Sequence, residues 1–134
     1  MFLGSSLTFA IISAFPSGQN TEGWKARIII VINGEQYPIP ADVGIINNET
    51  KAKVFTLNSE GIISKSVNED VTLKDFFDVW NQTFNSNCIL EYCNTNTSSM
   101  KMYLWDYSNS KWVENSDYEL YIIKNNDVIL IDYR

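Results

Sequence analysis

The chain has 134 residues, room for one domain with one modest core, and its 45% hydrophobic and 19% charged residues are typical of a globular protein. With 10 Lys and Arg against 16 Asp and Glu, the net charge is -6, so the chain repels phosphate backbones and we expect no nucleic-acid partner. It contains no histidine, which excludes a Ser-His-Asp triad, a Cys-His pair and a two-histidine zinc site within this chain.

The first 15 residues are mostly apolar, and the first charged side chain is Glu22. This run is shorter than the about 20 apolar residues that span a membrane, but a secretory signal needs only about 7–15. We therefore expect residues 1–20 to be a signal or membrane-anchor segment with a short spacer, anchored through residues 1–15 if it is kept. A buried N-terminal strand or helix is the alternative.

Two β-hairpins are expected next. Lys25 to Ile32 is rich in β-branched residues and runs into Asn33-Gly34, which suits a two-residue turn. The return strand, Glu35 to Pro40, should lie at an edge or end its pairing early, because Pro38 cannot donate a ladder hydrogen bond. The second hairpin should form from Lys53 to Leu57 and Gly61 to Val67.

The segment after these hairpins carries the best helix signal. Thr72 and Asp75 have the spacing of a capping box, although Asp replaces the usual Glu. One apolar stripe follows, formed by Leu73, Phe76, Phe77, Trp80 and Phe84. Because so short a helix is unstable alone, it should pack against a sheet.

The last third is expected to be β again. Met100 to Tyr107 alternates, and Lys111 to Glu114 returns across a short turn. Tyr118 to Ile123 leads to another turn and to the last strand, Val128 to Tyr133. In that strand Ile129, Ile131 and Tyr133 share one face, and Val128 and Leu130 the other.

This order of elements predicts an α+β fold. More specifically, it favours a β-grasp-like mixed sheet of hairpins packed against one amphipathic helix, preceded by the hydrophobic N-terminal segment. No repeat or linker interrupts residues 25–134, so we expect them to form a single domain.

The cysteines and the asparagines bear on location. Cys88 and Cys93 have the wrong spacing for a CxxC redox motif, so a disulfide closing a short turn is expected, with two buried free thiols as the alternative. Three N-x-[ST] sequons make Asn48, Asn81 and Asn96 candidate glycosylation sites. Together with the hydrophobic start, these features favour an extracytoplasmic protein, secreted or membrane-anchored.

Two sets of acidic residues are candidates for metal or catalytic chemistry: Asp70, Asp75 and Asp78, and Glu114, Asp117 and Glu119. The first set fits no EF-hand spacing, and acids at a helix N-terminus are usually partners of the helix dipole. The second set would need two carboxylates facing each other across a cleft. We therefore expect no metal, no cofactor and no catalytic residue.

The aromatic residues give the candidate binding site. Tyr103, Trp105 and Tyr107 alternate on one strand face, and Trp112 follows across the turn. Such rings can stack a sugar or hold a partner protein. The alternative is that they cover the sheet face opposite the helix as part of the core.

Several segments resemble small envelope proteins of ammonia-oxidising archaea. The resemblance runs through Ile32–Ile45 (INGEQYPIPADVGI), Ser59–Ile63, Thr72–Trp80, Cys88–Cys93 and Asn126–Ile129, and it covers about residues 25–134. It implies an N-terminal anchor or signal and an extracytoplasmic domain, with no established activity.

Many of these relatives carry a His-Thr-His-Asp stretch and a further histidine in the next strand, which is a candidate metal site. Here the matching positions are Phe55, Leu57 and Ser64. If the family site binds metal, this chain lacks it. Alternation instead favours Phe55 and Leu57 as core residues on one strand face.

These observations lead to one expectation with two alternatives. We expect a non-catalytic extracytoplasmic binding module, or an accessory subunit of a surface or membrane complex, whose partner is another protein or its own copies. A self-assembling subunit of a surface layer or filament is the first alternative. The second is a small carboxylate- or metal-dependent enzyme, whose activity would depend on Asp75 or Glu119.

Overall fold

The computed structural model describes residues 23–134, so the expected signal or anchor segment lies outside the described residues. Within these residues the fold is mixed α+β, mostly strands with one α-helix. The elements in chain order are β1 (Ala26–Ile32), β2 (Glu35–Tyr37), β3 (Val54–Thr56), β4 (Ile62–Lys65), α2 (Leu73–Trp80), β5 (Cys88–Ile89), β6 (Tyr92–Cys93), β7 (Met100–Asp106), β8 (Lys111–Glu114), η1 (Tyr118–Leu120) and β9 (Val128–Tyr133).

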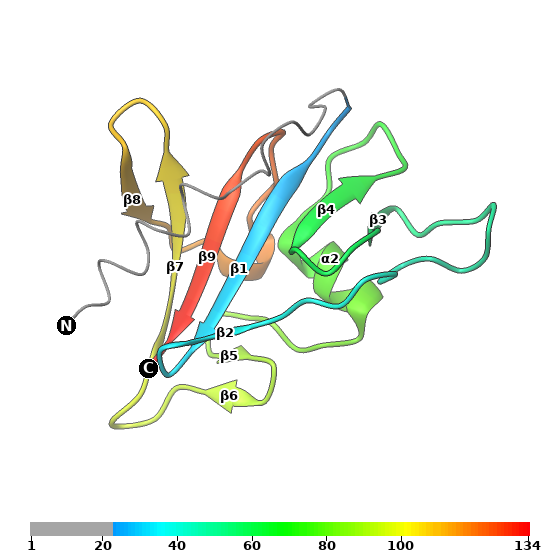
Figure 1. The fold of residues 1–134 in the computed structure, drawn as a ribbon. Helices are drawn as coiled ribbons and strands as arrows, with labels where there is room; N and C mark the ends of the chain where they lie inside the picture. The colour runs from blue at the N-terminus through cyan, green and yellow to red at the C-terminus, as the bar shows by residue number, and fades with distance from the viewer. Residues whose placement is uncertain (1–22) are drawn as a thin grey trace.

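The central pair of the main sheet joins two strands that are far apart in sequence. β1 and β9 run parallel, in register from Arg27↔Val128 to Ile32↔Tyr133. The sheet has seven strands in the order β3-β4-β1-β9-β7-β8, with β2 also paired to β1 (Figure 1). β4 and β2 share one edge of β1: β4 pairs with its first two residues and β2 with its last three.

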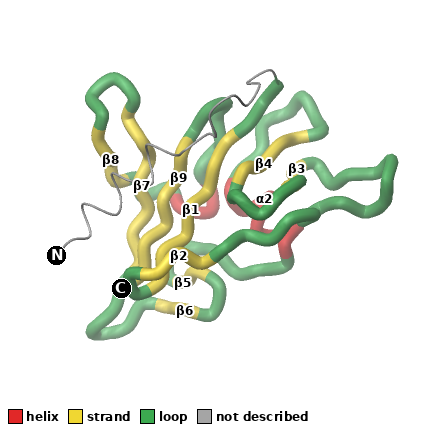
Figure 2. The backbone as a smooth tube through the Cα atoms, viewed as in Figure 1, coloured by secondary structure: helices red, strands yellow, loops and turns green. Residues whose placement is uncertain are grey.

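The expected hairpins are present. Asn33 and Gly34 turn the chain between β1 and β2 with φ of 51° and 88°, values that suit Asn and Gly. β2 ends at Tyr37, immediately before Pro38, which has no N–H to donate. The loop that follows projects from the sheet before β3 begins (Figure 2).

Helix α2 begins and ends as its sequence dictates. The Asp75 N–H donates to Thr72 Oγ1 and the Thr72 N–H donates to Asp75 Oδ2, so the capping box is complete. The helix stops at Asn81, which is left-handed with φ 63°. The expectation that Phe84 belongs to the apolar stripe of the helix is therefore wrong. Phe84 lies in the following loop and packs on Phe77, with ring centroids 4.8 Å apart.

The segment from Tyr118 to Ile123 is not a regular strand. Tyr118–Leu120 forms the 3-10 helix η1, and Ile122 makes an isolated β-bridge with Thr72. The expectation of a regular strand fails because the segment pairs with the chain that leads into α2. The Leu73 N–H donates to the Tyr121 carbonyl and the Ile123 N–H donates to the Val71 carbonyl, on either side of the Ile122–Thr72 bridge.

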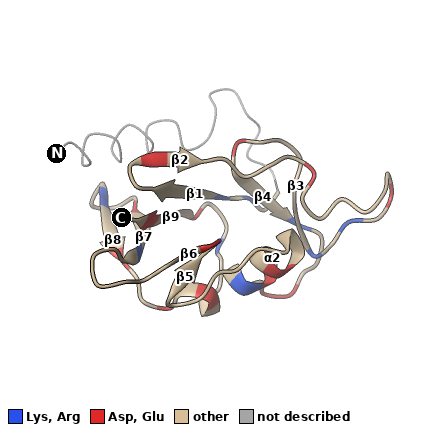
Figure 3. Cartoon of the chain, turned by 90° about the horizontal axis from the view of Figure 1, so that it is seen from below, with Lys and Arg blue, Asp and Glu red and all other residues tan. Residues whose placement is uncertain are grey.

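Hydrophobic side chains are buried on both faces of the sheet. The larger cluster lies between the sheet and α2 and includes Ile28, Ile30, Phe76, Ile129 and Ile131, all at most 2% exposed. The smaller cluster, of Ile29, Val128 and Leu130, lies on the opposite face because alternate strand residues point to opposite sides. Viewed from below, α2 and the β5–β6 hairpin lie on the same side of the β1–β9 pair (Figure 3).

Candidate functional site

Three of the four predicted aromatic residues come together on the sheet face opposite α2. Tyr103 and Trp105 of β7 and Trp112 of β8 are half-buried and pack against the smaller hydrophobic cluster. We call these three residues the aromatic face. The three rings cover part of this sheet face and remain partly exposed.

The two tryptophans form a cross-strand pair. Trp105 and Trp112 are register partners in β7 and β8, with ring centroids 5.3 Å apart and planes at 72°. This edge-to-face arrangement is favourable for aromatic rings. Trp112 Nε1 is buried and has no hydrogen-bond partner among residues 23–134. The aromatic face therefore holds an unsatisfied donor.

Tyr107 lies apart from the other three. It is 56% exposed in the turn beyond β7, and its hydroxyl donates to the Asn126 carbonyl at 2.8 Å. Burial and the nearby Asp127 carboxylate raise the pKa of its phenol. Its position ties the tip of the β7–β8 hairpin to the turn before β9.

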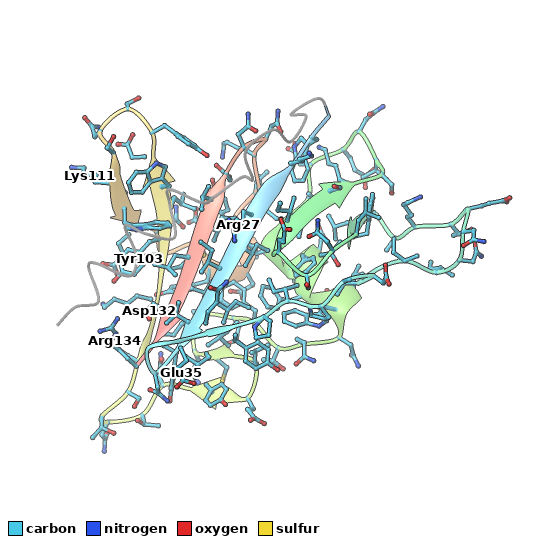
Figure 4. All side chains as sticks on the ribbon, in the orientation of Figure 1. Arg27, Glu35, Tyr103, Lys111, Asp132 and Arg134 are labelled. Atoms are coloured by element: carbon cyan, nitrogen blue, oxygen red, sulfur yellow. A yellow bond between two sulfur atoms is a disulfide. The ribbon has the colours of Figure 1, made fainter. Side chains whose placement is uncertain are left out.

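A cavity of about 290 Å³ opens at the Tyr103 end of the aromatic face. It is lined by Ser99, Lys101, Tyr103, Asp132 and Arg134. Figure 4 shows Tyr103, Asp132 and Arg134 along the same part of β7 and β9. Burial, followed by the carboxylates of Glu114 and Asp132, raises the pKa of the Tyr103 phenol. The Tyr103 phenol is therefore neutral at physiological pH. Tyr103 belongs both to the cavity lining and to the aromatic face.

Asp132 is the most unusual residue of this cavity. Its side chain is only 8% exposed, and Oδ2 accepts from Arg134 Nε at 3.1 Å and Nη2 at 2.8 Å. Oδ1 is buried and accepts no hydrogen bond from the described part of the chain. A buried polar group left unsatisfied costs about 1–3 kcal/mol, and more when it is charged. The described residues thus leave one oxygen of a buried carboxylate without a hydrogen-bond donor.

The sequence prediction of the site missed Asp132. The signal is visible in retrospect, because this acid interrupts VILIDY, a strand in which all residues from Val128 to Tyr133 are buried. A charge at a buried strand position requires a partner. The sequence alone does not show which residues surround Asp132. The register of β7 and β9 shows that Lys101 stands opposite it.

The structure does not bring the other acidic residues together. Asp75 is bound by Thr72 and Lys53, and Asp78 pairs with Lys74 at 2.8 Å. Glu114 faces Lys101, with 3.6 Å between Oε2 and Nζ. Within residues 23–134 no three His, Cys, Asp or Glu side chains are placed to share a metal ion.

Of the three positions that match histidines of the archaeal envelope proteins, two are adjacent and the third lies outside the strand. Phe55 is buried and Ser64 is its register partner in β4, whereas Leu57 is 62% exposed in the turn beyond β3. The expectation that Phe55 and Leu57 both belong to the core is wrong for Leu57. The strand ends at Thr56, and its alternation ends with it.

The expected disulfide is present. Cys88 and Cys93 are register partners in β5 and β6 and are covalently linked across the short hairpin. Asn48, Asn81 and Asn96 are all exposed. Among the described residues, no helix is long and apolar enough to cross a membrane.

The chain matches no protein-family model, no curated protein and no solved structure.

Proposed function

We propose that this chain is a non-catalytic extracytoplasmic binding module, an accessory subunit of a surface or membrane complex that recognises its partner through the sheet face opposite α2. One observation carries the proposal. On that face, half-buried aromatic rings adjoin a cavity, and both contain buried polar atoms with no partner within residues 23–134, Trp112 Nε1 and Asp132 Oδ1. Aromatic residues beside a few unsatisfied polar groups are characteristic of binding sites.

A β-grasp arrangement is the fold that we propose for this module. Its support is the strand order, in which the first and last described strands lie parallel at the centre of the sheet. Hairpin β1–β2 precedes the helix, hairpin β7–β8 follows it, and η1 leads into β9. Among residues 23–134, α2 covers one face of the sheet and no α-helix covers the other.

The extracytoplasmic location is supported by the Cys88–Cys93 disulfide, because such bonds persist in oxidising compartments. The exposed sequon asparagines Asn48, Asn81 and Asn96 are accessible to glycosylation there. The resemblance to archaeal envelope proteins favours the same location. Anchorage through residues 1–15 is part of the proposal and concerns residues outside those described.

A non-catalytic role fits the chemistry of the acids. The carboxylates of Asp75, Asp78 and Glu114 each have a lysine partner. A general acid or base works best with a pKa near the operating pH. The pKa of Asp75 is instead lowered despite its partial burial, because Thr72 and Lys53 stabilise the charged form.

Site-specific photocrosslinking tests the proposed face. The full chain would carry a benzophenone amino acid at Tyr107, 56% exposed at the tip of the β7–β8 hairpin, and would be mixed with solubilised envelope of its source cells. The matched control carries it at Leu120, 68% exposed in η1, which contacts α2. We expect a discrete heterologous adduct from position 107 and none from position 120.

The other outcomes separate the alternatives. An adduct with twice the mass of the chain would favour the self-assembling subunit. Adducts from position 120 alone would place the interface on the helix side, and no adduct from either position would contradict the proposed binding role.

A further inference from the structure

The cavity beside Asp132 contains a specific, unfilled acceptor. Asp132 stands in the middle of three strands, with Val31 of β1 and Lys101 of β7 as its register partners. Both Arg134 hydrogen bonds go to Oδ2. The remaining oxygen, Oδ1, is buried without a partner among the described residues. A ligand for this cavity must therefore supply a hydrogen-bond donor.

The charges around the cavity are balanced. Arg134 pairs with Asp132 at 2.8 Å, and Lys101 lies 3.6 Å from Glu114, which stands beside the cavity and not in its lining, so these four side-chain charges sum to zero. A metal cation entering the cavity would meet Lys101 and Arg134. An anion would meet the Asp132 carboxylate, and Glu114 beside Lys101 would add to the repulsion. The electrostatics thus favour a neutral ligand over either kind of ion.

A neutral ligand must also satisfy the donors of the cavity. Lys101 and Arg134 present N–H groups and no acceptors, whereas Asp132 presents only acceptors. Hydroxyl groups on adjacent carbons of a sugar ring can donate to Asp132 and accept from Lys101 and Arg134, since each hydroxyl donates one hydrogen bond and accepts others. The Tyr103 ring and the two tryptophans beyond it add the apolar surface on which a sugar ring can pack.

Size limits the ligand further. The cavity volume of about 290 Å³ is just below the roughly 300–1,000 Å³ of most small-molecule pockets. It is suited to one sugar unit and not to a nucleotide cofactor.

We propose that this cavity binds a neutral sugar unit of a surface glycan, with adjacent hydroxyls that donate to Asp132 Oδ1 and accept from Lys101 and Arg134. The proposal rests on the proposed binding function and names the ligand class of the same face. A peptide partner is the competing occupant, and the test below separates the two.

The test is an NMR titration of the full chain. Amide shifts would be followed during addition of methyl glycosides of glucose, galactose and mannose, and of N-acetylglucosamine, each to about 50 mM. We expect at least one of these sugars to bind with a millimolar Kd, a range usual for small neutral ligands at shallow sites. The shifts should be confined to residues 99–105, 112 and 131–134, which include the cavity lining and the two tryptophans.

Variants assign the binding to the cavity. Asp132→Asn should weaken binding about tenfold to a hundredfold, the effect of losing one charge-assisted hydrogen bond. Asp70→Asn, a matched change of an exposed acid outside the cavity, should leave binding unchanged. Because Asp132→Asn also weakens the partly buried ion pair with Arg134, Lys101→Met serves as the second variant. Lys101 is 53% exposed, so this change should weaken binding without affecting folding.

Three results would overturn the sugar proposal. These are no binding by any of the four sugars, binding that maps to other residues, and binding that is insensitive to both cavity variants. If any one of these results occurs while the Tyr107 crosslink to a partner protein persists, the module is a protein binder and only the proposed ligand class is wrong. If the crosslink is also absent, the proposed function fails as well.

Discussion

Thr56 and Asp132 are the two buried polar side chains within residues 23–134, and their hydrogen bonding differs. Thr56 is 0% exposed; its Oγ1 donates to the Pro40 carbonyl at 2.8 Å and accepts from the Val43 N–H at 3.0 Å. Every polar function of this hydroxyl is satisfied by the chain. Asp132 Oδ1, in contrast, has no hydrogen-bond partner among the described residues. We therefore interpret Thr56 as a structural residue and propose Asp132 as a binding residue.

Thr56→Val should destabilise the protein by about 2 kcal/mol, because the Val43 N–H and the Pro40 carbonyl lose their buried partner while the shape is conserved. Urea unfolding at equilibrium measures the change. The control is Thr50→Val at an exposed position, expected within about 0.5 kcal/mol of the parent. Equal losses at both positions would show that the hydroxyl of Thr56 is not a structural link.

At the scale of elements, Asp75 connects α2 to the sheet. Its Oδ2 accepts from the Thr72 N–H at 2.9 Å, and its Oδ1 lies 3.0 Å from Lys53 Nζ, next to β3. Burial opposes ionisation of this carboxyl, but the Thr72 hydrogen bond and Lys53 outweigh it and lower its pKa. Because the folded pKa lies below the unfolded one, the stabilisation is present above the unfolded pKa and is lost as the pH falls through the folded pKa.

Asp75→Asn should therefore cost about 1 kcal/mol at pH 7, the usual contribution of a capping residue. The difference between the two proteins should shrink below about pH 4, the unfolded carboxyl pKa. Urea unfolding between pH 3 and pH 7 checks both parts. Asp78→Asn is the control, since its pair with Lys74 is exposed and should contribute little. A pH-independent gap for Asp75→Asn would contradict the assignment.

The β5–β6 hairpin depends on its disulfide. Its strands have two residues each, too few for independent stability, although Ile89 is buried at 0% and Tyr92 packs on Tyr133. Replacing both Cys88 and Cys93 by serine should cost about 2 kcal/mol, from the entropy of closing so short a loop. Reductant should produce the same shift in the urea midpoint of the parent and none in the double variant. A parent unaffected by full reduction would refute this role.

At the scale of the whole molecule, the parallel pairing of β1 with β9 unites the fold. Ile30 and Ile131 are register partners and both are 0% exposed. Each change to alanine should cost about 2–5 kcal/mol, and the double variant should depart from additivity by at least about 0.5 kcal/mol. Combining Ile30→Ala with Val113→Ala on β8, two strands beyond β9, should be additive. Additive behaviour of the first pair would argue against the central β1–β9 contact.

Local sequence signals predict hairpins and the helix, but they do not predict how these elements assemble into the sheet. Asn33-Gly34 predicts its hairpin and Thr72 with Asp75 predicts its helix, because turns and caps are encoded within a few residues. The conformation of Tyr118 to Ile123 could not be predicted, since its backbone hydrogen bonds go to Val71 and Leu73, far earlier in the chain. The aromatic face followed from alternation, but the Asp132 cavity needed the register between β7 and β9, and sequence periodicity does not contain that register.

The central pairing also has a consequence for synthesis. A ribosome makes β9 roughly one hundred residues after β1, which at about 5–20 residues per second is a delay of roughly 5–20 s. Throughout that interval the run Ile28–Ile32 has an unpaired backbone edge, and its side chains have the composition that promotes intermolecular β-pairing. The nascent chain is therefore most vulnerable to aggregation until Val128–Tyr133 emerges, and a chaperone that shields β1 during elongation would protect it more than one acting on the finished domain.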